Sequence, residues 1–551
     1  MFKQKDRIIY LVYGALALII LFPLLKSGYI FAMDMVFAPH LSWPEQFNIP
    51  GAFLYFLNFI LPSQVIQKLL LFAILFLAGI GMHKLIPTES RLPKYFAGIL
   101  YVFNPFVYSR FLFGHLWLLM AYALMPFVVK SIFEFLNKIN FRNALKLSFW
   151  FVLIGFISSH FIVLVSLFFV IALLVYLWKN RRTYANILSM FKYGILISLI
   201  FLIFSSWWIF PYFNKISPQG QFVQEAIGQK DFEAFKTTSD AKYGVLLNVA
   251  ALYGFWGDRM DQYVVPKDVI QGWFLLFLII LALVIFGMIS AFKKNKFIAG
   301  IFVAVGVVAF IFSVGIAYQP FSSLMNFLNE KIFIFKGFRE SQKFSALLVL
   351  VYAYFGAFGI NNIMSKLKNK TFYFLLSTFY ILIIALPILY SPLMVWGFGG
   401  QLYASHYPQE WFEANEILNQ DRDNFKVLFL PWHQYMPFGF IENKVVANPA
   451  PQFFDKETIA GDNMEIGVYT HSKRPISKVV EDIVLKRIQG IENFGEMLVP
   501  FNIKYIILAK EDDWLEYKFL DAQKDLEPIF DLEKLRIYQN KSWSNLAAKS
   551  Y

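Results

Sequence analysis

The sequence predicts a polytopic α-helical membrane protein of about eleven transmembrane helices, followed by a C-terminal extracytoplasmic α/β domain. Three features support the membrane class, and the first two are a high content of hydrophobic residues and a low content of charged ones. Hydrophobic residues make up 58% of the 551 residues and charged residues only 16%, with a mean hydropathy of +0.53, whereas soluble domains are more charged and less apolar. The third feature is the recurrence of apolar runs of about twenty residues, the length that crosses a bilayer as a helix.

Eleven apolar runs predict the membrane spans, at about 8–30, 65–86, 94–112, 115–136, 144–158, 161–178, 191–212, 271–292, 297–317, 343–364 and 371–395. The first run follows a basic start but is too long for a signal peptide, so we expect it to be retained as a span. The fifth and sixth runs are short and meet at 158–160. They are alternatively one long kinked helix.

Lysine and arginine residues predict the orientation. With the N-terminus in the cytoplasm, each of the six inside segments carries three or four of them, and the short outside segments carry far fewer. This pattern satisfies the positive-inside rule. An odd number of spans in the cell membrane then places the C-terminal domain outside. Because the basic residues that produce the net charge of +13 lie in these short segments, we do not expect nucleic acid as a partner.

The sequence divides into a transmembrane domain at 1–395 and an extracytoplasmic domain at 396–551. Outer loops of the first are expected at about 31–64, 213–270 and 318–342. The apolar run from Ile49 to Leu61 is too short to span, so we expect an interfacial helix. In the second domain, β-like runs at 425–430, 505–508 and 535–538 and a helical stretch at 411–419 predict a mixed α/β fold. The chain has no cysteine, which excludes disulfide bonds.

Ionisable residues at the predicted outer membrane face are the candidate functional groups. Asp34 comes directly after the first span, and Arg110 lies at the outer end of the third. Arg339, Glu340 and Lys343 form one short charged segment before the tenth span. Charges at a membrane boundary are costly unless they reach water, pair or bind a ligand. We therefore take Arg110, Arg339, Glu340 and Lys343, together with His40 of the first loop, as candidate substrate- or phosphate-binding residues.

These residue types suit the transfer of a sugar outside the cell. Nucleotide sugars are not supplied there, so the donor must be a lipid-phosphate sugar. A carboxylate such as Asp34, assisted by His40, can take a proton from the acceptor hydroxyl. Cations such as Arg110, Arg339 and Lys343 can stabilise the departing lipid phosphate. The sequence has no P-loop, dinucleotide-binding, zinc-protease or serine-hydrolase motif that would indicate a different chemistry.

On these residues the chain resembles the GT-C superfamily of integral-membrane, polyprenyl-phosphate-sugar-dependent glycosyltransferases, and within it the arabinofuranosyltransferase- and mannosyltransferase-like proteins. The resemblance covers about 1–395. It rests on Asp34, the interfacial helix after it, and the stretches 104–115 and 338–344. Many members carry paired acidic residues in the first loop, whereas Met35 follows Asp34 here, which argues against a metal ion bridged by an acidic pair.

The resemblance implies a GT-C-like fold and an inverting hexosyl- or pentosyltransferase in which Asp34 is the catalytic base. It also implies membrane lipids as surroundings, a polyprenyl-phosphate-linked sugar as donor, and a cell-surface glycan or lipid as acceptor. The acceptor is recognised by the C-terminal domain. The sequence leaves open which sugar is transferred and whether a divalent cation takes part.

Several alternatives remain. Instead of acting as the base, Asp34 could be a solvated residue that caps a helix. Instead of binding phosphate, the cations could be anchors at the membrane surface. Asp258 and Asp261 either bind a divalent cation or an acceptor, or belong to a polar loop. The histidines after 396 are too scattered to predict a metal site. The alternative to a glycosyltransferase is a non-catalytic scaffold or a transporter in surface polysaccharide or lipid assembly.

Overall fold

The computed structural model describes residues 4–44, 47–181, 184–366, 373–463, 465, 471–472, 474–485 and 490–544. The chain forms two compact units. The first, called here the helical unit, comprises Met1–Pro23, Asn48–Pro50 and Leu69–Gln401. The second, called the mixed unit, comprises Leu24–Phe47, Gly51–Lys68 and Leu402–Tyr551. The first outer loop and the C-terminal region therefore belong to the same compact body.

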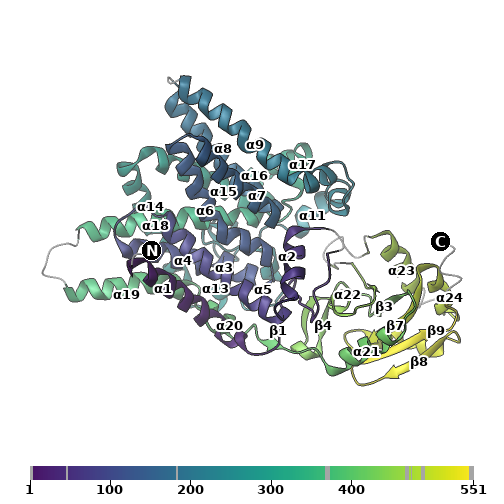
Figure 1. Cartoon of the computed structure of the whole chain (residues 1–551). Coiled ribbons are helices and arrows are strands. Elements are labelled where there is room, and N and C mark those ends of the chain that lie inside the picture. The colour runs from purple at the N-terminus through teal and green to yellow at the C-terminus, as the bar shows by residue number, and fades with distance from the viewer. Residues whose placement is uncertain are drawn as a thin grey trace. The chain divides into compact units, whose positions relative to one another are not determined.

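Long helices make up most of the helical unit (Figure 1). They are α1 (Gln4–Leu21), α3 (Ser63–Leu85), α4 (Arg91–Val102), α5 (Pro105–Leu112), α6 (Leu116–Asn137), α7 (Phe141–Ile157), α8 (Ser159–Asn180), α9 (Tyr184–Phe213), α14 (Trp273–Lys294), α15 (Lys296–Val314), α16 (Gln319–Lys331), α18 (Ser345–Lys366) and α19 (Tyr373–Tyr390). Shorter ones connect them: α10 (Pro218–Gln221), α11 (Gln229–Ala234), α12 (Gly244–Ala250), α13 (Pro266–Val269), α17 (Phe333–Lys336) and α20 (Val395–Gly399).

Among the described residues, eight helices are long and apolar enough to cross a membrane, or nine if the bent pair Tyr380–Tyr390 and Pro392–Gly399 forms one span. About eleven were predicted. The predicted span at 94–112 is instead two short helices, because Asn104 is extended and Pro105, which lacks an N–H, starts a new helix. The predicted span at 144–158 is α7, which is 17 residues long.

The helices α7 and α8 are separate, which excludes the alternative of one kinked helix. Ser158 between them is extended, and its hydroxyl accepts a hydrogen bond from the Phe161 N–H at 3.3 Å. The rings of Phe151 and Phe169 lie 5.7 Å apart. In one continuous helix these residues would be about 27 Å apart. The two helices therefore fold back on each other.

The helix α18 is the core of the helical unit, and it crosses α14 at two glycines. A Cβ atom on Gly287 would lie 1.7 Å from the Phe355 carbonyl oxygen, and one on Gly359 would lie 2.4 Å from the Leu283 carbonyl oxygen. Such small residues let membrane helices approach closely, where packing rather than water drives association. Most of α9, in contrast, faces outward, because only 11% of the residues in its most apolar stretch are buried.

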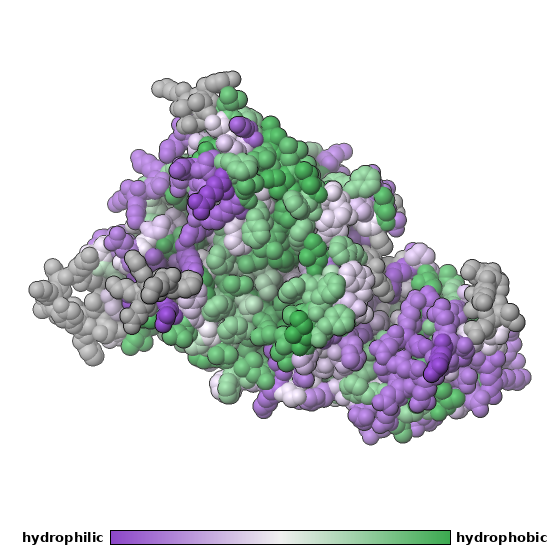
Figure 2. Space-filling model, in the orientation of Figure 1, coloured by the Kyte–Doolittle hydropathy of each residue, from purple (hydrophilic) through white to green (hydrophobic). Residues whose placement is uncertain are grey.

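Hydrophobic side chains dominate the middle of the visible face of the helical unit, with hydrophilic side chains gathered at its upper left, whereas the visible face of the mixed unit is largely hydrophilic (Figure 2). Exposed leucine, isoleucine and phenylalanine side chains are frequent on α9 and α14. A soluble surface rarely exposes so much contiguous apolar area. The helical unit therefore has the surface expected of a protein in contact with lipid.

A five-stranded sheet organises the mixed unit, with the strand order β6-β3-β7-β9-β8. The strand β3 is parallel to β6 and β7, and β9 is antiparallel to β7 and β8. The bounds are β3 (Lys426–Leu430), β6 (Thr458–Ile459), β7 (Ile503–Ala509), β8 (Leu526–Asp531) and β9 (Leu535–Asn540). With α21 (Gln409–Gln420), these elements confirm the predicted strands and helix. The further helices are α22 (Ala450–Phe453), α23 (Pro475–Leu485) and α24 (Phe494–Leu498).

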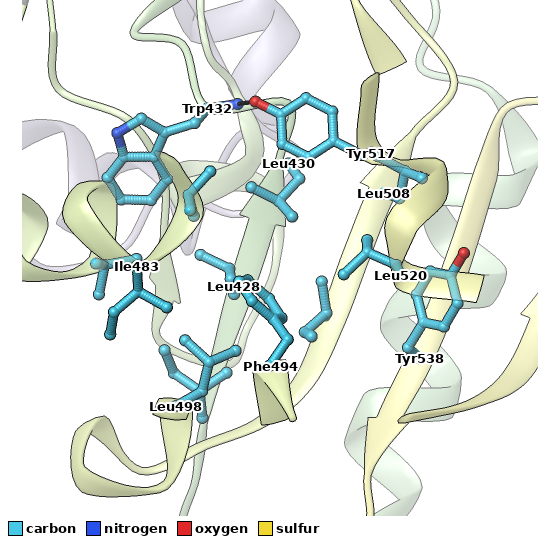
Figure 3. Close-up of a cluster of buried hydrophobic side chains, with 14 of the residues drawn as sticks. Leu428, Leu430, Trp432, Ile483, Phe494, Leu498, Leu508, Tyr517, Leu520 and Tyr538 are labelled. Carbon is cyan, nitrogen blue, oxygen red and sulfur yellow. Dashed lines mark hydrogen bonds between the residues drawn. The ribbon is translucent and has the colours of Figure 1, made fainter. Parts of the chain in front are cut away.

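Side chains from the sheet and its helices form the core of the mixed unit (Figure 3). Leu428, Leu430 and Phe494 are fully buried there. The Tyr517 hydroxyl accepts a hydrogen bond from the Trp432 N–H at 2.9 Å, which ties the end of β3 to the segment before β8. The backbone that leaves β3 is therefore held where it turns toward the next strand.

Two smaller pairs of strands complete the mixed unit. The hairpin of β4 (Tyr435–Phe438) and β5 (Lys444–Ala447) is antiparallel, and so is the pairing of β1 (Tyr29–Ile30) with β2 (Ala404–Ser405). The first loop also contains α2 (Ile49–Asn58), which confirms the short helix predicted there. Its place in a membrane interface stays a prediction.

The crossing of α14 and α18 predicts the effect of adding one methyl group. Gly287→Ala should lower the melting temperature of the detergent-solubilised protein, because overpacking typically costs about 1–3 kcal/mol. Gly300→Ala is the matched control, since nothing lies within 4 Å of a Cβ at that position. Equal melting temperatures for the two variants would contradict the close crossing.

Candidate active site

Asp34 lies at the tip of a tight turn. The Ala32 N–H donates to the Met35 carbonyl at 3.2 Å, and the Met35 N–H donates to the Ala32 carbonyl at 2.7 Å. Asp34 is exposed, whereas Ala32, Met33 and Met35 are buried. The apolar neighbours anchor the turn and leave the carboxylate at the surface. This arrangement suits a group that must reach a substrate.

The hairpin of β4 and β5 holds this turn. The Ala447 N–H donates to the Met33 carbonyl at 2.7 Å, and the Tyr435 hydroxyl donates to Asp34 Oδ1 at 2.8 Å. Tyr435 and Ala447 are directly opposite each other in the hairpin. One pair of residues therefore fixes both the backbone of the turn and its carboxylate.

Polar groups and rings also hold the chain before and after the turn. The Gln67 side chain bonds to both backbone groups of Ile30, accepting from N–H at 2.9 Å and donating to the carbonyl at 2.6 Å. The Tyr407 hydroxyl donates to the Phe37 carbonyl at 3.1 Å. The ring of Phe31 packs edge-on against Tyr407 at 5.3 Å. The loop is therefore held both by α3 and by the C-terminal region.

His40 is exposed on the same loop. The Ser63 hydroxyl donates to the Ala38 carbonyl at 2.6 Å and lies 3.1 Å from the Pro39 carbonyl oxygen, so the backbone before His40 is fixed. These contacts place His40 and Asp34 in one ordered segment. The role of His40 as an assistant to the base stays a prediction.

In the helical unit, Arg110 is completely buried on α5. Asn104 caps this helix by accepting a hydrogen bond from the Val107 N–H at 3.0 Å. This cap fixes the start of α5 at the break after α4. Arg110 Nη1 donates to Glu340 Oε2 at 2.7 Å and lies 3.1 Å from His115 Nδ1. Its Nε and Nη2 atoms have no hydrogen-bond partner among the described residues.

Glu340 joins two buried cations. Its Oε1 atom lies 3.1 Å from Lys343 Nζ, while its Oε2 atom accepts from Arg110. Lys343 Nζ is also 3.1 Å from His160 Nε2, at the start of α8. Burial makes an unpaired charge very costly, so each member of this chain of ionisable groups depends on its neighbours. If both histidines are neutral, the two cations and the one carboxylate of this buried group give it one net positive charge.

Arg339 directly precedes Glu340, and its guanidinium packs on aromatic rings, as that of Arg110 does on Phe255 at 4.1 Å. It is half-buried, and its guanidinium carbon lies 4.4 Å from the centre of the Phe235 ring and 5.5 Å from that of Phe222. Stacking on rings is a common way to hold an arginine whose donors face a ligand. The sequence predicts Arg339 as the first candidate for phosphate, and that role stays a prediction.

The candidate residues fall into two groups. Asp34 and His40 belong to the mixed unit, and the other four belong to the helical unit. The structure brings Arg110, Glu340 and Lys343 into direct contact. A cavity shared by Asp34 and Arg339 stays a prediction.

Asp258 belongs to a small pocket in the second outer segment, which Tyr108, Tyr253 and Tyr263 also line. The Tyr263 hydroxyl donates to Asp258 Oδ1 at 2.6 Å. Burial raises the pKa of Asp258 to about 6, although this hydrogen bond opposes the shift. Asp261 is exposed and has a left-handed backbone (φ 51°). Within the described ranges, no three His, Cys, Asp or Glu side chains form a group able to hold a metal ion.

His433 is a charged centre that sequence reasoning missed. Its Nδ1 lies 2.6 Å from Glu465 Oε1, and its Nε2 lies 3.2 Å from Asp513 Oδ1. Burial disfavours the imidazolium, but the nearby carboxylates of Asp513 and Glu465 outweigh burial and raise the pKa of His433 to about 10. These partners are far away in sequence, so no local pattern indicates the cluster.

Comparison with known proteins gives the fold. No protein-family model matches the chain, and no curated protein matches its sequence. The chain is similar to the cryo-EM structure of the arabinofuranosyltransferase AftD from Mycobacteria, with a TM-score of 0.64 and 12% identity over 98% of this chain. A mutant of AftD gives a TM-score of 0.61 and 13% identity over 98% of this chain. These matches cover 40% and 42% of the AftD chains.

The archaeal oligosaccharyltransferase AglB from Archaeoglobus fulgidus, solved with an inhibitory peptide and a dolichol-phosphate, gives a TM-score of 0.45 and 11% identity. That match covers 94% of this chain and 67% of AglB. The similarity to AftD shows that the chain is a multi-pass membrane protein of GT-C-like fold with a C-terminal α/β region, as predicted. The chain spans about two fifths of the length of AftD.

The His433 cluster predicts a pH-dependent contribution to stability. Because the pKa of His433 is higher in the folded than in the unfolded state, its protonation stabilises the folded protein. This contribution is complete below the unfolded pKa of about 6.5 and is lost as pH rises through the folded pKa of about 10. His433→Asn should therefore lower the melting temperature more at pH 6 than above pH 10. The control is the exposed His406, whose substitution by Asn should have little effect at either pH. An equal loss for His433→Asn at both values would contradict the ion cluster.

Proposed function

We propose that the chain is a membrane glycosyltransferase that moves a sugar from a polyprenyl-phosphate donor to a cell-surface glycan or lipid acceptor, with inversion. The observation that carries the proposal is an exposed Asp34, held at the tip of a buried turn, in a chain whose fold is similar to that of an arabinofuranosyltransferase. The N-terminus is cytoplasmic in this proposal, so the mixed unit lies on the outer face of the cell membrane.

The chemistry is a single displacement at the anomeric carbon. Asp34 takes the proton of the acceptor hydroxyl as that oxygen bonds to the anomeric carbon, while the bond from this carbon to the lipid-phosphate oxygen breaks. Attack from the face opposite the leaving phosphate inverts the configuration. The electrons of the broken bond remain on the phosphate, which departs as a dianion. Its extra charge requires cations nearby.

Arg110, Lys343 and Arg339 supply these cations in the proposal. Two nitrogens of Arg110 lack a hydrogen-bond partner within the described chain, although the residue is fully buried. A buried guanidinium with open donors is well suited to two phosphate oxygens. Glu340 bridges Arg110 and Lys343, so we assign to it the orientation of both cations. The mixed unit, with its polar surface, binds the acceptor.

Asp34→Asn tests the base. Transfer by the purified protein should fall by roughly 10²–10⁴-fold, because the amide cannot accept the proton, while affinity for polyprenyl phosphate should remain. Asp482→Asn is a matched control at an exposed aspartate on α23. Near-normal transfer by Asp34→Asn would favour the non-catalytic scaffold instead.

Substitutions in the helical unit test the donor site. Arg110→Gln and Arg339→Ala should each weaken binding of polyprenyl phosphate by about 1.5–3 kcal/mol, the usual value of a charged hydrogen bond. Titration of the lipid into the solubilised protein measures this change. Arg142→Gln, at an exposed arginine, should bind normally.

Arg110→Gln leaves Glu340 buried without its partner, which can destabilise the unit. The double variant Arg110→Gln/Glu340→Gln removes that uncompensated charge. It should fold and still bind the lipid weakly. If it binds like the parent protein, Arg110 does not contact the phosphate.

A further inference from the structure

The contact between Tyr435 and Asp34 links the two ends of the chain. The hydroxyl of Tyr435 donates to Asp34 Oδ1 at 2.8 Å across 401 positions of sequence. Both residues belong to the mixed unit. A phenol that donates to a carboxylate makes a charge-assisted hydrogen bond, which is stronger and more directional than a neutral one. The bond therefore restrains the rotation of the Asp34 side chain.

The element that presents Tyr435 is well ordered by its own packing. Met436 and Phe438 of β4 and Val446 of β5 are buried, so the inner face of the hairpin is fixed. The ring of Phe438 lies 6.0 Å from that of Trp411 on α21. Tyr435 is in register with Ala447, whose N–H donates to the Met33 carbonyl. The hairpin therefore fixes the position of the Tyr435 hydroxyl relative to the turn that carries Asp34.

We infer that Tyr435 is a positioning residue for Asp34 and that the mixed unit, through β4 and β5, completes the catalytic group. This inference rests on the proposed function. The hydrogen bond from Tyr435 to Oδ1 restrains the plane of the Asp34 carboxylate, and so the direction from which this group receives the acceptor proton. Reaction rates are sensitive to such placement, because small displacements of a reacting group cost large factors in rate.

This assignment changes what the C-terminal region does. In the sequence prediction that region only recognises the acceptor. With Tyr435 as part of the site, it also sets the geometry of the base. The two tasks are compatible, since a unit that binds the acceptor and holds the base fixes the distance between them.

The test is the removal of one oxygen atom. Tyr435→Phe should lower kcat by about 10-fold or more, as expected for the loss of a hydrogen bond to a charged group, and leave KM for the polyprenyl-phosphate sugar within about 2-fold. Tyr505→Phe is the matched control. It removes a tyrosine hydroxyl of the same unit that also donates to a carboxylate, that of Asp421 at 2.7 Å, but among the described residues does not contact the first loop. It should retain kcat.

A double-mutant cycle separates positioning from stability. In the Asp34→Asn background, Tyr435→Phe should change the residual transfer rate by less than about 2-fold, because the group that it orients is gone. A purely structural role would lower the melting temperature and reduce the rate by the same factor in both backgrounds. That result, or a normal kcat for Tyr435→Phe, would overturn the inference.

The outcomes also distinguish this inference from the proposed function. If Asp34→Asn abolishes transfer and Tyr435→Phe is normal, the base remains and only the positioning role fails. If Asp34→Asn transfers normally, the proposed function itself fails, whatever Tyr435→Phe does.

Discussion

The hydrogen bond from the Ala447 N–H to the Met33 carbonyl decides where Asp34 lies. It adds the first outer loop to the hairpin of β4 and β5, and the other contacts of the loop follow from that attachment. Gln67 then satisfies both backbone groups of Ile30, and Tyr407 covers Phe37. A loop that starts at a membrane span would otherwise be a connection with few restraints of its own. Here it is a built part of a folded body.

A second constraint governs the helical unit, where charges are buried among apolar helices. Arg110, Glu340 and Lys343 are tolerated because each lies against a group that offsets its charge or accepts its hydrogen bond. The arrangement is asymmetric, since Arg110 keeps donors that nothing in the described chain uses. Proteins rarely leave such donors open in their interiors. A ligand or an ordered water would satisfy them.

The local features were predictable from sequence, and the long-range contacts were not. Apolar length identified most of the spans, and short β-like runs identified β3, β7 and β9 to within two residues. The break at Asn104-Pro105 also carries a local signal, because proline starts a helix readily but interrupts one. Counting 94–112 as one span ignored that signal, and α7 is shorter than a typical span. These two segments account for most of the difference in span number.

The candidate site shows the limit more clearly. Asp34 and Arg110 are recognisable by their place beside predicted spans, but their partners are not. Glu340 is 230 positions from Arg110, and Tyr435 is 401 from Asp34. Nothing in the pattern around 435 distinguishes it from the other tyrosines of the chain. Such pairings depend on tertiary packing, which hydrophobic periodicity does not encode.

The membership of the first loop in the mixed unit limits how such a protein can diversify. A C-terminal region that only selected acceptors could be exchanged between relatives as a separable module. Here the loop from Leu24 to Phe47 and the region after Gln401 form one body. A foreign C-terminal region would lack the surface on which this loop folds, and a truncation before Leu402 would leave the loop without its support. Under the proposed function, new acceptor specificities would then arise by coordinated changes in two distant stretches of the gene, or by substitutions that leave the β4–β5 hairpin intact.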